Sequence, residues 1–222
     1  MFSPVMQPDA SSSPPRSAAL AGAPRFPILT LDERKLTPAL GYIFDRRWLD
    51  PCESLISILW KFEKANALPG YTVARLMGPD IDPYAGIAPQ LGLVDLRRLH
   101  QSLPVPVKTL RAALLPPPQR RGCSSVFRHC RRCMAHGYHS VLHQLESISV
   151  CPAHHQSLES ACRRCGYEAP HLVNVRLLET PYRCAYCRAS YGGQGWTPNA
   201  ARPMKAEFRK AFTRRYFERY FG

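Results

Sequence analysis

The residues with the clearest chemical potential are cysteines and histidines that recur at a fixed, short spacing. Three cysteine pairs share the C-x2-C spacing: Cys130 with Cys133, Cys162 with Cys165, and Cys184 with Cys187. A fourth pair reads C-x2-H and joins Cys151 to His154. A two-residue spacer lets one tight turn direct both donor atoms at a common point, which is half of a tetrahedral zinc site.

These pairs combine into two complete sets of four ligands. The first set is Cys130, Cys133, Cys151 and His154, and the second is Cys162, Cys165, Cys184 and Cys187. The intervals between the pairs, seventeen and eighteen residues, fall in the range of about 15–20 residues typical of paired zinc turns. Four donors leave no position open for water, so the sequence predicts two structural Zn(2+) ions and not a catalytic one.

Structural zinc also bears on stability. Binding at such a site contributes about 10–16 kcal/mol, which exceeds the stability of a domain this small. We therefore expect the segment from about Cys130 to Cys187 to be unfolded without metal.

Other histidines offer alternative metal ligands. His139 and His143 are four residues apart and could bind metal, or could make packing and polar contacts. His155 competes with His154 for the first zinc, although the C-x2 spacing favours His154. A C-x2-C pair also serves thioredoxin-like redox chemistry, but that chemistry needs a βαβ context that the sequence does not indicate.

The charge of the chain points to a polyanionic partner. Thirty Lys and Arg against sixteen Asp and Glu give a formal charge of +14, as in proteins that bind nucleic acid or an acidic membrane surface. From residue 120 onward, seventeen basic residues face six acidic ones, a formal +11.

Four arginines occupy the spacers of two zinc turns: Arg131, Arg132, Arg163 and Arg164. Their side chains must point outward because the cysteines point in, so we expect them to contact nucleic-acid phosphates. The competing interpretation is that they only keep a small metal module soluble.

Apolar spacing predicts helices before the cysteine-rich segment. The clearest is an amphipathic helix over 51–68, followed by a shorter one over 71–77. Two short helices, over 96–103 and 107–114, could form a helix-turn-helix pair with Lys108 and Arg111 near the start of the second helix, where phosphate or base contacts are made. A plain helical hairpin that fills a core explains the same pattern.

The distribution of prolines and basic residues divides the chain into four predicted segments. We predict a disordered Pro/Ser-rich tail over 1–38, a helical domain over 39–118, a double zinc-finger domain over 119–200 and a basic amphipathic helix over 201–222. A stiff basic linker at 116–122 marks the main boundary. The last helix carries four aromatic residues four positions apart, which favour packing on this protein or a partner over base stacking: Phe208, Phe212, Tyr216 and Tyr220.

The predicted fold class is a small α-helical, helix-turn-helix-like N-terminal domain followed by a zinc-stabilised α+β module and a basic C-terminal helix. A short helix over about 138–145 is expected to connect the two halves of the first zinc site. The 222 residues allow one or two domains. No stretch approaches the roughly 18–20 apolar residues that a bilayer demands, and there is no secretory signal, so we expect a cytoplasmic protein without a membrane partner.

Two segments together resemble a known family. The segments ESLISILWKFEKANAL and RHCRRCMAHGYHSVLHQLESISVCPAHHQSLESACRRCG are similar to the TniQ family of transposition proteins, which includes TnsD-like target-site selectors. The family block runs C-x2-C, then a stretch such as YHSxxHQL, then CPxH, then a C-x2-C-G pair. Each element is present here, and the resemblance spans roughly Glu53 to Cys187.

The resemblance implies a non-catalytic protein with a helical region of helix-turn-helix character and two zinc fingers built from the ligand sets above. It implies binding to target DNA or to a targeting complex, and recruitment of an AAA+ ATPase that brings the transposase. Many relatives continue into further helical modules, so a chain ending at Gly222 fits a short or truncated form.

Two other functions compete with a DNA-binding adaptor of transposition. One is a pure protein–protein adaptor without DNA affinity. The other is a metal-dependent nuclease that uses His136, His139 or His143 with a glutamate. A transposase site needs spaced carboxylates around two metals, and the acidic residues after residue 120 are all glutamates, so we expect no catalysis.

Overall fold

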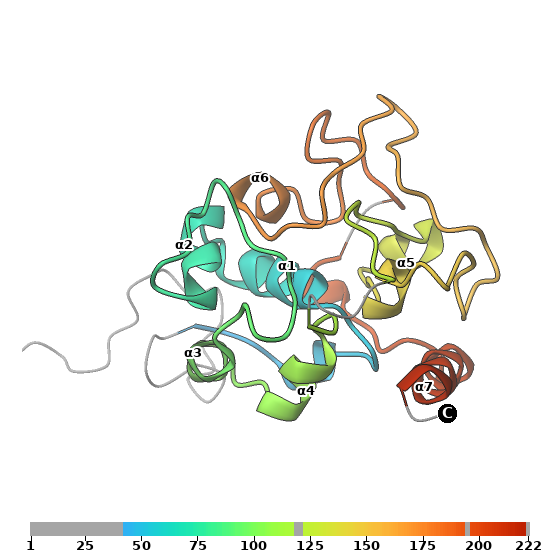
Figure 1. The fold of residues 1–222 in the computed structure, drawn as a ribbon, viewed down its shortest axis with the longest axis horizontal. Coiled ribbons are helices and arrows are strands. Elements are labelled where there is room, and N and C mark those ends of the chain that lie inside the picture. Colours follow the sequence, from blue (N-terminus) through green and yellow to red (C-terminus); the bar gives the residue numbers. More distant parts are fainter. Residues whose placement is uncertain (1–41, 118–121, 194–195, 221–222) are drawn as a thin grey trace, which may run out of the picture.

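Helix α1 (Leu55–Asn66) lies at the centre of the computed structural model, which describes residues 42–117, 122–193 and 196–220 (Figure 1). Its first eight residues, 55–62, are all buried. The Ser54 hydroxyl accepts a hydrogen bond from the Ser57 N–H at 3.2 Å, and Ala67 ends the helix in the left-handed conformation. The helix predicted over 51–68 is therefore confirmed, but it begins later because Glu53 forms a β-bridge with Ser140 and the Ser54 N–H donates to the His139 carbonyl.

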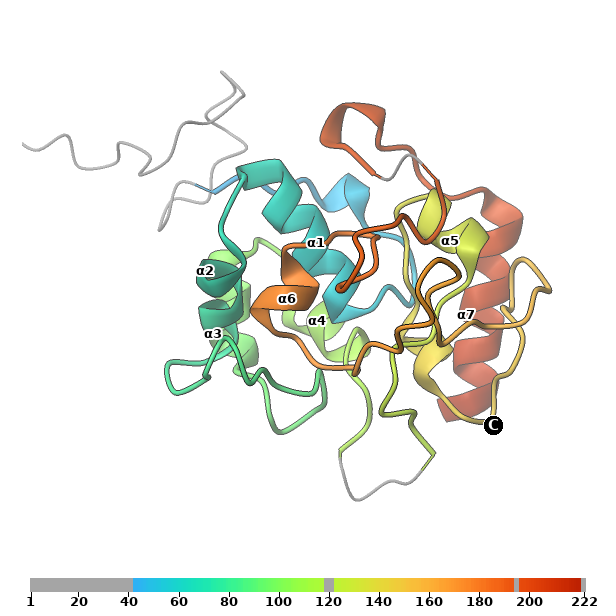
Figure 2. The same ribbon diagram turned by 90° about the horizontal axis from the view of Figure 1, so that it is seen from above.

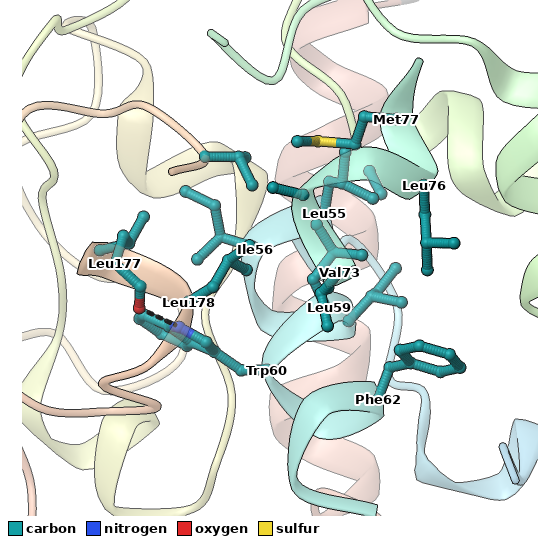
Figure 3. Close-up of a cluster of buried hydrophobic side chains, with 14 of the residues drawn as sticks. Leu55, Ile56, Leu59, Trp60, Phe62, Val73, Leu76, Met77, Leu177 and Leu178 are labelled. Atoms are coloured by element: carbon teal, nitrogen blue, oxygen red, sulfur yellow. Dashed lines mark hydrogen bonds between the residues drawn. The ribbon is translucent and has the colours of Figure 1, made fainter. Parts of the chain in front are cut away.

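Short helices surround α1. They are α2 (Gly70–Ala74), η3 (Arg75–Met77), α3 (Leu96–Ser102), α4 (Val107–Ala112) and α6 (Val175–Leu178). Figure 3 shows side chains of α1, α2 and α6 interlocking, with the Trp60 indole N–H donating to the Leu177 carbonyl at 2.8 Å. The helices predicted over 71–77, 96–103 and 107–114 are all present, the first as α2 followed by η3.

The remaining helices flank this core. They are η2 (Arg46–Trp48), α5 (Arg131–Ala135), η4 (Val141–Gln144), η5 (Pro198–Ala200) and α7 (Ala206–Tyr220). Both ribbon views place α5 and α7 side by side at one end of the molecule (Figures 1 and 2). Among the described residues, no helix has the length and apolar character to cross a membrane.

The fold is mostly helical, and the strands expected in the metal module are reduced to isolated β-bridges within the described residues. Three of these bridges close tight turns around metal-ligand pairs: Val150 with Ser157, Ala161 with Glu168, and Arg183 with Ser190. Each turn reverses the chain at once, so the paired segments are too short to extend into a ladder.

The helix predicted over 138–145 is wrong in type and length. Only residues 141–144 are helical, as the 3-10 helix η4, which Ser140 caps by accepting from the Leu142 N–H at 3.2 Å. The preceding residues pair with the start of α1, where the Ser54 N–H donates to the His139 carbonyl at 2.8 Å and the Val141 N–H to the Cys52 carbonyl at 3.0 Å. This long-range pairing removes the residues that would have formed the first helical turn.

The hydrophobic core crosses the predicted domain boundary near residue 118. Trp60 of α1 packs against Phe127 and Tyr182, with ring centroids 5.7 and 4.9 Å apart, and buried Cys162 and Cys184 belong to the same cluster. A second cluster joins the first ligand set to α7 through Tyr138 and Phe212. The predicted tail over 1–38 and residues 118–121 of the linker lie outside the described residues.

A buried ion pair lies where the two halves meet. Lys61 and Glu53 are almost fully buried and 2.6 Å apart. The Lys61 ammonium also donates to the Trp48 carbonyl at 2.6 Å, and Glu53 accepts from the Ser57 hydroxyl at 2.6 Å. Burial raises the pKa of Glu53 against the opposing effect of Lys61. Such a pair is costly to break because one charge would then be left buried alone.

Candidate metal centre

The first ligand set converges on one point beside α5. The Nδ1 atom of His154 lies 3.6 Å from the Cys130 sulfur, 3.2 Å from the Cys133 sulfur and 3.6 Å from the Cys151 sulfur. The sulfurs of Cys133 and Cys151 are 3.6 Å apart. The three cysteines are buried and the histidine is half-buried.

The second set converges in the same way, where the Cys162–Cys165 and Cys184–Cys187 turns meet. The sulfur of Cys162 lies 3.6 Å from that of Cys187, and the sulfur of Cys165 lies 3.7 Å from that of Cys184. In each set, all four donor atoms lie within 4.8 Å of one another. The structure thus brings together all eight predicted ligands, in the two predicted groups.

These separations fit a tetrahedral metal ion. Zn–S bonds of about 2.3 Å at tetrahedral angles place ligand sulfurs about 3.8 Å apart, and a Zn–N bond of about 2.0–2.1 Å shortens the sulfur–nitrogen distance to about 3.6 Å. The observed spacings of 3.2–3.7 Å match these values. Each cluster can therefore hold one metal ion, with three thiolates and an imidazole in the first site and four thiolates in the second.

Three of the four ligand pairs lie on turns with one repeated geometry. In each turn the N–H of the residue after the second ligand donates to the carbonyl of the first: His155 to Cys151 at 2.9 Å, Gly166 to Cys162 at 2.8 Å, and Arg188 to Cys184 at 2.9 Å. That residue adopts a positive φ in every case, 50° at His155, 73° at Gly166 and 60° at Arg188. The sequence predicts a positive φ only at Gly166, where the C-x2-C-G pattern places a glycine. His155 and Arg188 adopt the same left-handed conformation, although residues with a side chain do not favour it.

The fourth pair is built differently. Cys130 precedes α5 and Cys133 lies within it, so a helical turn replaces the tight turn and brings both sulfurs to one side. Gly137 follows at φ 74°, where a Cβ atom would collide with the Trp196 side chain. The helix therefore fixes one half of the first site, and the Cys151–His154 turn fixes the other half.

Neighbouring groups support both sites. The His154 ring packs against Phe208 of α7, with centroids 4.7 Å apart, which holds the imidazole in place. The Tyr186 N–H points at the Cys184 sulfur at 3.4 Å. Burial opposes ionisation of Cys162, but hydrogen bonds from the backbone N–H groups of Cys165 and Arg164 and from the Cys187 and Cys184 thiols together lower the pKa of its thiol to about 7. Thiolate is the form that binds metal.

The other histidines considered as ligands lie elsewhere. His139 is buried, with Nδ1 2.7 Å from the Ser54 hydroxyl and Nε2 2.8 Å from the Arg128 carbonyl. His143 is buried beside it, with ring centroids 5.2 Å apart. His155 is exposed, at the turn after His154. His139 and His143 therefore make packing and polar contacts, which was the alternative to metal binding. His154, and not His155, completes the first cluster.

The predicted DNA-contacting residues are all exposed. Arg131 and Arg132 project from the start of α5, and Arg163 and Arg164 from the Cys162–Cys165 turn. Arg163 also forms a salt bridge with Glu159 at 2.7 Å. Lys108 and Arg111 are exposed on α4, which packs against α3. The helix pair α3–α4 is present, and its role as a DNA-binding helix-turn-helix stays a prediction.

Sequence reasoning missed a hollow of about 490 Å³ beside the first cluster. Arg132 and His136 line it from the α5 side, Arg202 and Lys205 from the segment before α7, and Phe208 from α7 itself. Of the described residues that line it, none is acidic. The basic residues come from segments about seventy positions apart, so only the fold could reveal that they meet.

Comparison with known proteins adds no relative. No protein-family model matches the chain, and a search of curated proteins found no match.

Proposed function

We propose that this chain is a non-catalytic, zinc-dependent DNA-binding adaptor of a transposition system, which helps to select the target site and recruits an AAA+ ATPase and transposase. The observation that carries the proposal is the pair of closed four-ligand clusters with arginines on their outer faces. Each cluster supplies all four donors to one metal ion, which suits a scaffold better than a catalytic centre. We assign Zn(2+) to both because thiolate and imidazole donors in tetrahedral array favour it.

Charge supports DNA as the partner. The clusters with Zn(2+) carry formal charges of −1 and −2, so residues 120–222 keep a formal +8 after correction from +11. Arg132, Arg202 and Lys205 line the hollow beside the first cluster, and the acid next to it, Asp50, accepts from the Met204 N–H and pairs with Arg209. Phosphate contacts of this kind supply most of the affinity of non-specific DNA binding.

The role in transposition rests on the resemblance to the TniQ family. The YHSVLHQ stretch that carries much of this resemblance pairs with the start of α1, through Ser54 and His139. In this proposal the metal half and the helical half act as one adaptor body. Genes for a transposase and an AAA+ ATPase beside the gene for this chain are the expected genomic setting.

Salt-dependent DNA binding tests the proposal. The affinity for a duplex should fall steeply with salt, and the Arg131→Ala/Arg132→Ala protein should lose up to about 1.8 units of the logarithmic slope, about 0.9 for each phosphate contact removed. The matched control is Lys64→Ala/Arg75→Ala, which removes two exposed charges far from the clusters. Duplex affinity that is absent, or a slope that falls equally in both variants, would favour a protein–protein adaptor. Metal-dependent cleavage of the duplex would favour a nuclease.

A further inference from the structure

The two most exposed large hydrophobic side chains identified among the described residues line the same cleft. Tyr84 is 74% exposed and Tyr186 is 69% exposed, and both border a hollow of about 560 Å³. Tyr167 lines it as well, with its ring 5.6 Å from that of Tyr186 and inclined by 30°. Aromatic side chains are costly to leave in water, and their grouping marks a surface that binds something.

The three tyrosines come from separate parts of the chain. Tyr167 and Tyr186 belong to the two turns of the second metal cluster, whereas Tyr84 lies in the loop between η3 and α3. The loop is fixed to α6 by the hydrogen bond from the Val175 N–H to the Pro83 carbonyl at 2.8 Å. Both ribbon views show α6 between this loop and the loops of the metal module (Figures 1 and 2).

The cleft is also basic. Arg176 of α6 and Arg188 of the last metal turn line it, both are exposed, and neither forms a salt bridge within the described residues. Glu179 is the acidic residue in the lining, so cations outnumber anions. An anionic ligand is therefore favoured over a neutral one.

The metal turn holds this wall in place. The Arg188 N–H donates to the Cys184 carbonyl at 2.9 Å, and the Tyr186 N–H lies 3.4 Å from the Cys184 sulfur. A rigid wall loses little conformational entropy when a ligand binds.

We propose that this tyrosine cleft binds unpaired nucleotides, whose bases stack on Tyr84, Tyr167 and Tyr186 while Arg176 and Arg188 contact the phosphates. Every base presents a flat π-face, and a basic groove with aromatic side chains is how proteins bind single strands without sequence preference. Proline-rich peptides also bind aromatic grooves, but a neutral peptide would leave both arginines without an anion. The inference deepens the proposed DNA-binding function, on which it rests, by adding a second mode of contact.

Three labelled probes separate stacking from charge: oligo(dT), an abasic oligonucleotide of the same length, and a duplex. Fluorescence anisotropy with the zinc-loaded full chain should show tighter binding to oligo(dT) than to the abasic strand. Tyr186→Ala should weaken oligo(dT) binding about tenfold, as the loss of one stacking contact predicts, and should leave abasic binding unchanged. Tyr186→Phe should retain the affinity.

Tyr71→Ala is the matched control, since Tyr71 is 45% exposed on α2 and does not line the cleft. Native mass spectrometry must find two zinc ions in every variant, so that a loss of affinity is not a loss of fold. Equal affinity for oligo(dT) and the abasic strand would overturn the inference. So would oligo(dT) binding that survives in both Tyr84→Ala and Tyr186→Ala, or a polyproline peptide that binds and is lost in Tyr186→Ala while oligo(dT) binding persists.

The duplex probe keeps this inference distinct from the proposed function. Duplex binding that depends on Arg131 and Arg132, together with no preference for oligo(dT), would leave the proposed function standing and remove the cleft as a nucleotide site. Oligo(dT) binding that depends on Tyr186, without duplex binding, would support the cleft and overturn duplex recognition by the metal turns.

Discussion

His171 is an uncharged base enclosed by aromatic rings. It is almost fully buried, its ring stacks over Phe127 at a centroid distance of 6.2 Å, and its Nε2 atom has no hydrogen-bond partner within the described residues. Burial lowers the pKa of His171 to about 3, because the charged imidazolium would lose its water. The folded protein therefore holds this residue neutral at any pH above that value.

The pH dependence of stability follows from this shift. In the unfolded chain His171 takes up a proton near pH 6.5, whereas the folded chain does so only near pH 3. Between these values the unfolded state binds one more proton, so this residue makes the free energy of unfolding fall by about 1.4 kcal/mol per pH unit as the pH falls. The His171→Phe protein should lack this contribution and keep the stacking on Phe127.

Urea unfolding of both proteins with zinc present checks this prediction. The stability of wild type relative to His171→Phe should drop by about 1.0 kcal/mol from pH 6.5 to pH 5.5, because the unfolded residue is already half protonated at pH 6.5, while loss of metal and protonation of the other buried histidines affect both proteins alike. Parallel pH profiles would show that the pKa of His171 is the same in the folded and the unfolded protein.

Metal content can be tested ligand by ligand. Cys184→Ser should reduce the zinc bound by native mass spectrometry from two ions to one, because hydroxyl oxygen is a poor zinc donor and the other cluster shares none of its four ligands. Cys52→Ser is the control, since burial raises the pKa of Cys52 to about 12 and its thiol belongs to neither cluster. Two ions in Cys184→Ser would mean that the second cluster does not need this sulfur.

At the same scale, the sequence predicted the ligands well and their surroundings poorly. A ligand pair three positions apart is encoded locally, so spacing alone separated His154 from His155. The left-handed backbone at His155 and Arg188 follows from the hydrogen-bonded turn around each ligand pair, not from residue preference. The burial of His139 under α1 depends on Ser54, 85 positions away, and no local pattern reports such a contact.

Among the helices, α7 shows how an amphipathic pattern is satisfied. Phe212 is fully buried against Tyr138, with centroids 5.0 Å apart, and Phe208 covers the ligand His154. The aromatic residues of α7 therefore pack on this protein, as the sequence predicted for one of two alternatives. The helix therefore closes the first cluster and leaves its basic face outside.

Truncating α7 at its buried face should be costly. Phe212→Ala should lower the free energy of unfolding by about 3–5 kcal/mol, the usual range for a phenylalanine removed from a core. Phe217 on the same helix is 56% exposed, and Phe217→Ala should change stability by no more than about 0.5 kcal/mol. Thermal or urea unfolding of both variants measures the difference. Equal effects would mean that α7 is not docked through Phe212.

Helix prediction succeeded where the apolar period was long and failed where long-range pairing intervened. The period in α1 covers three turns and predicted the helix, but residues 55–62 are buried on every side, including the polar Ser57 and Lys61, so this part of the helix has no exposed face. Over 138–145 the apolar spacing was genuine, since Tyr138, Leu142 and Leu145 are all buried. However, the bridge between Ser140 and Glu53 holds Ser140 extended, and a local sequence pattern does not reveal such a distant partner.

For the molecule as a whole, the second metal cluster and α1 share one core. The sequence suggested a boundary near residue 118, because prolines and basic residues interrupt the helical pattern there. Yet Trp60 packs on Phe127 and Tyr182, and buried Cys184 lies in the same cluster. We therefore extend the expectation that the segment from about Cys130 to Cys187 unfolds without metal: α1 would lose one wall of its packing and should unfold with it.

Hydrogen exchange with and without a zinc chelator tests this coupling. Chelation removes about 10–16 kcal/mol of binding free energy at each site, more than the whole stability of a typical domain. Amides of α1 (Leu55–Asn66) should then lose protection together with those of the metal turns, and adding zinc back should restore both. In two independent domains, by contrast, α1 would keep its protection while residues 130–187 exchange freely. Such a result would mean that α1 stays in place without the hydrogen bond from Trp60 to Leu177, held by other contacts such as the buried Lys61–Glu53 pair.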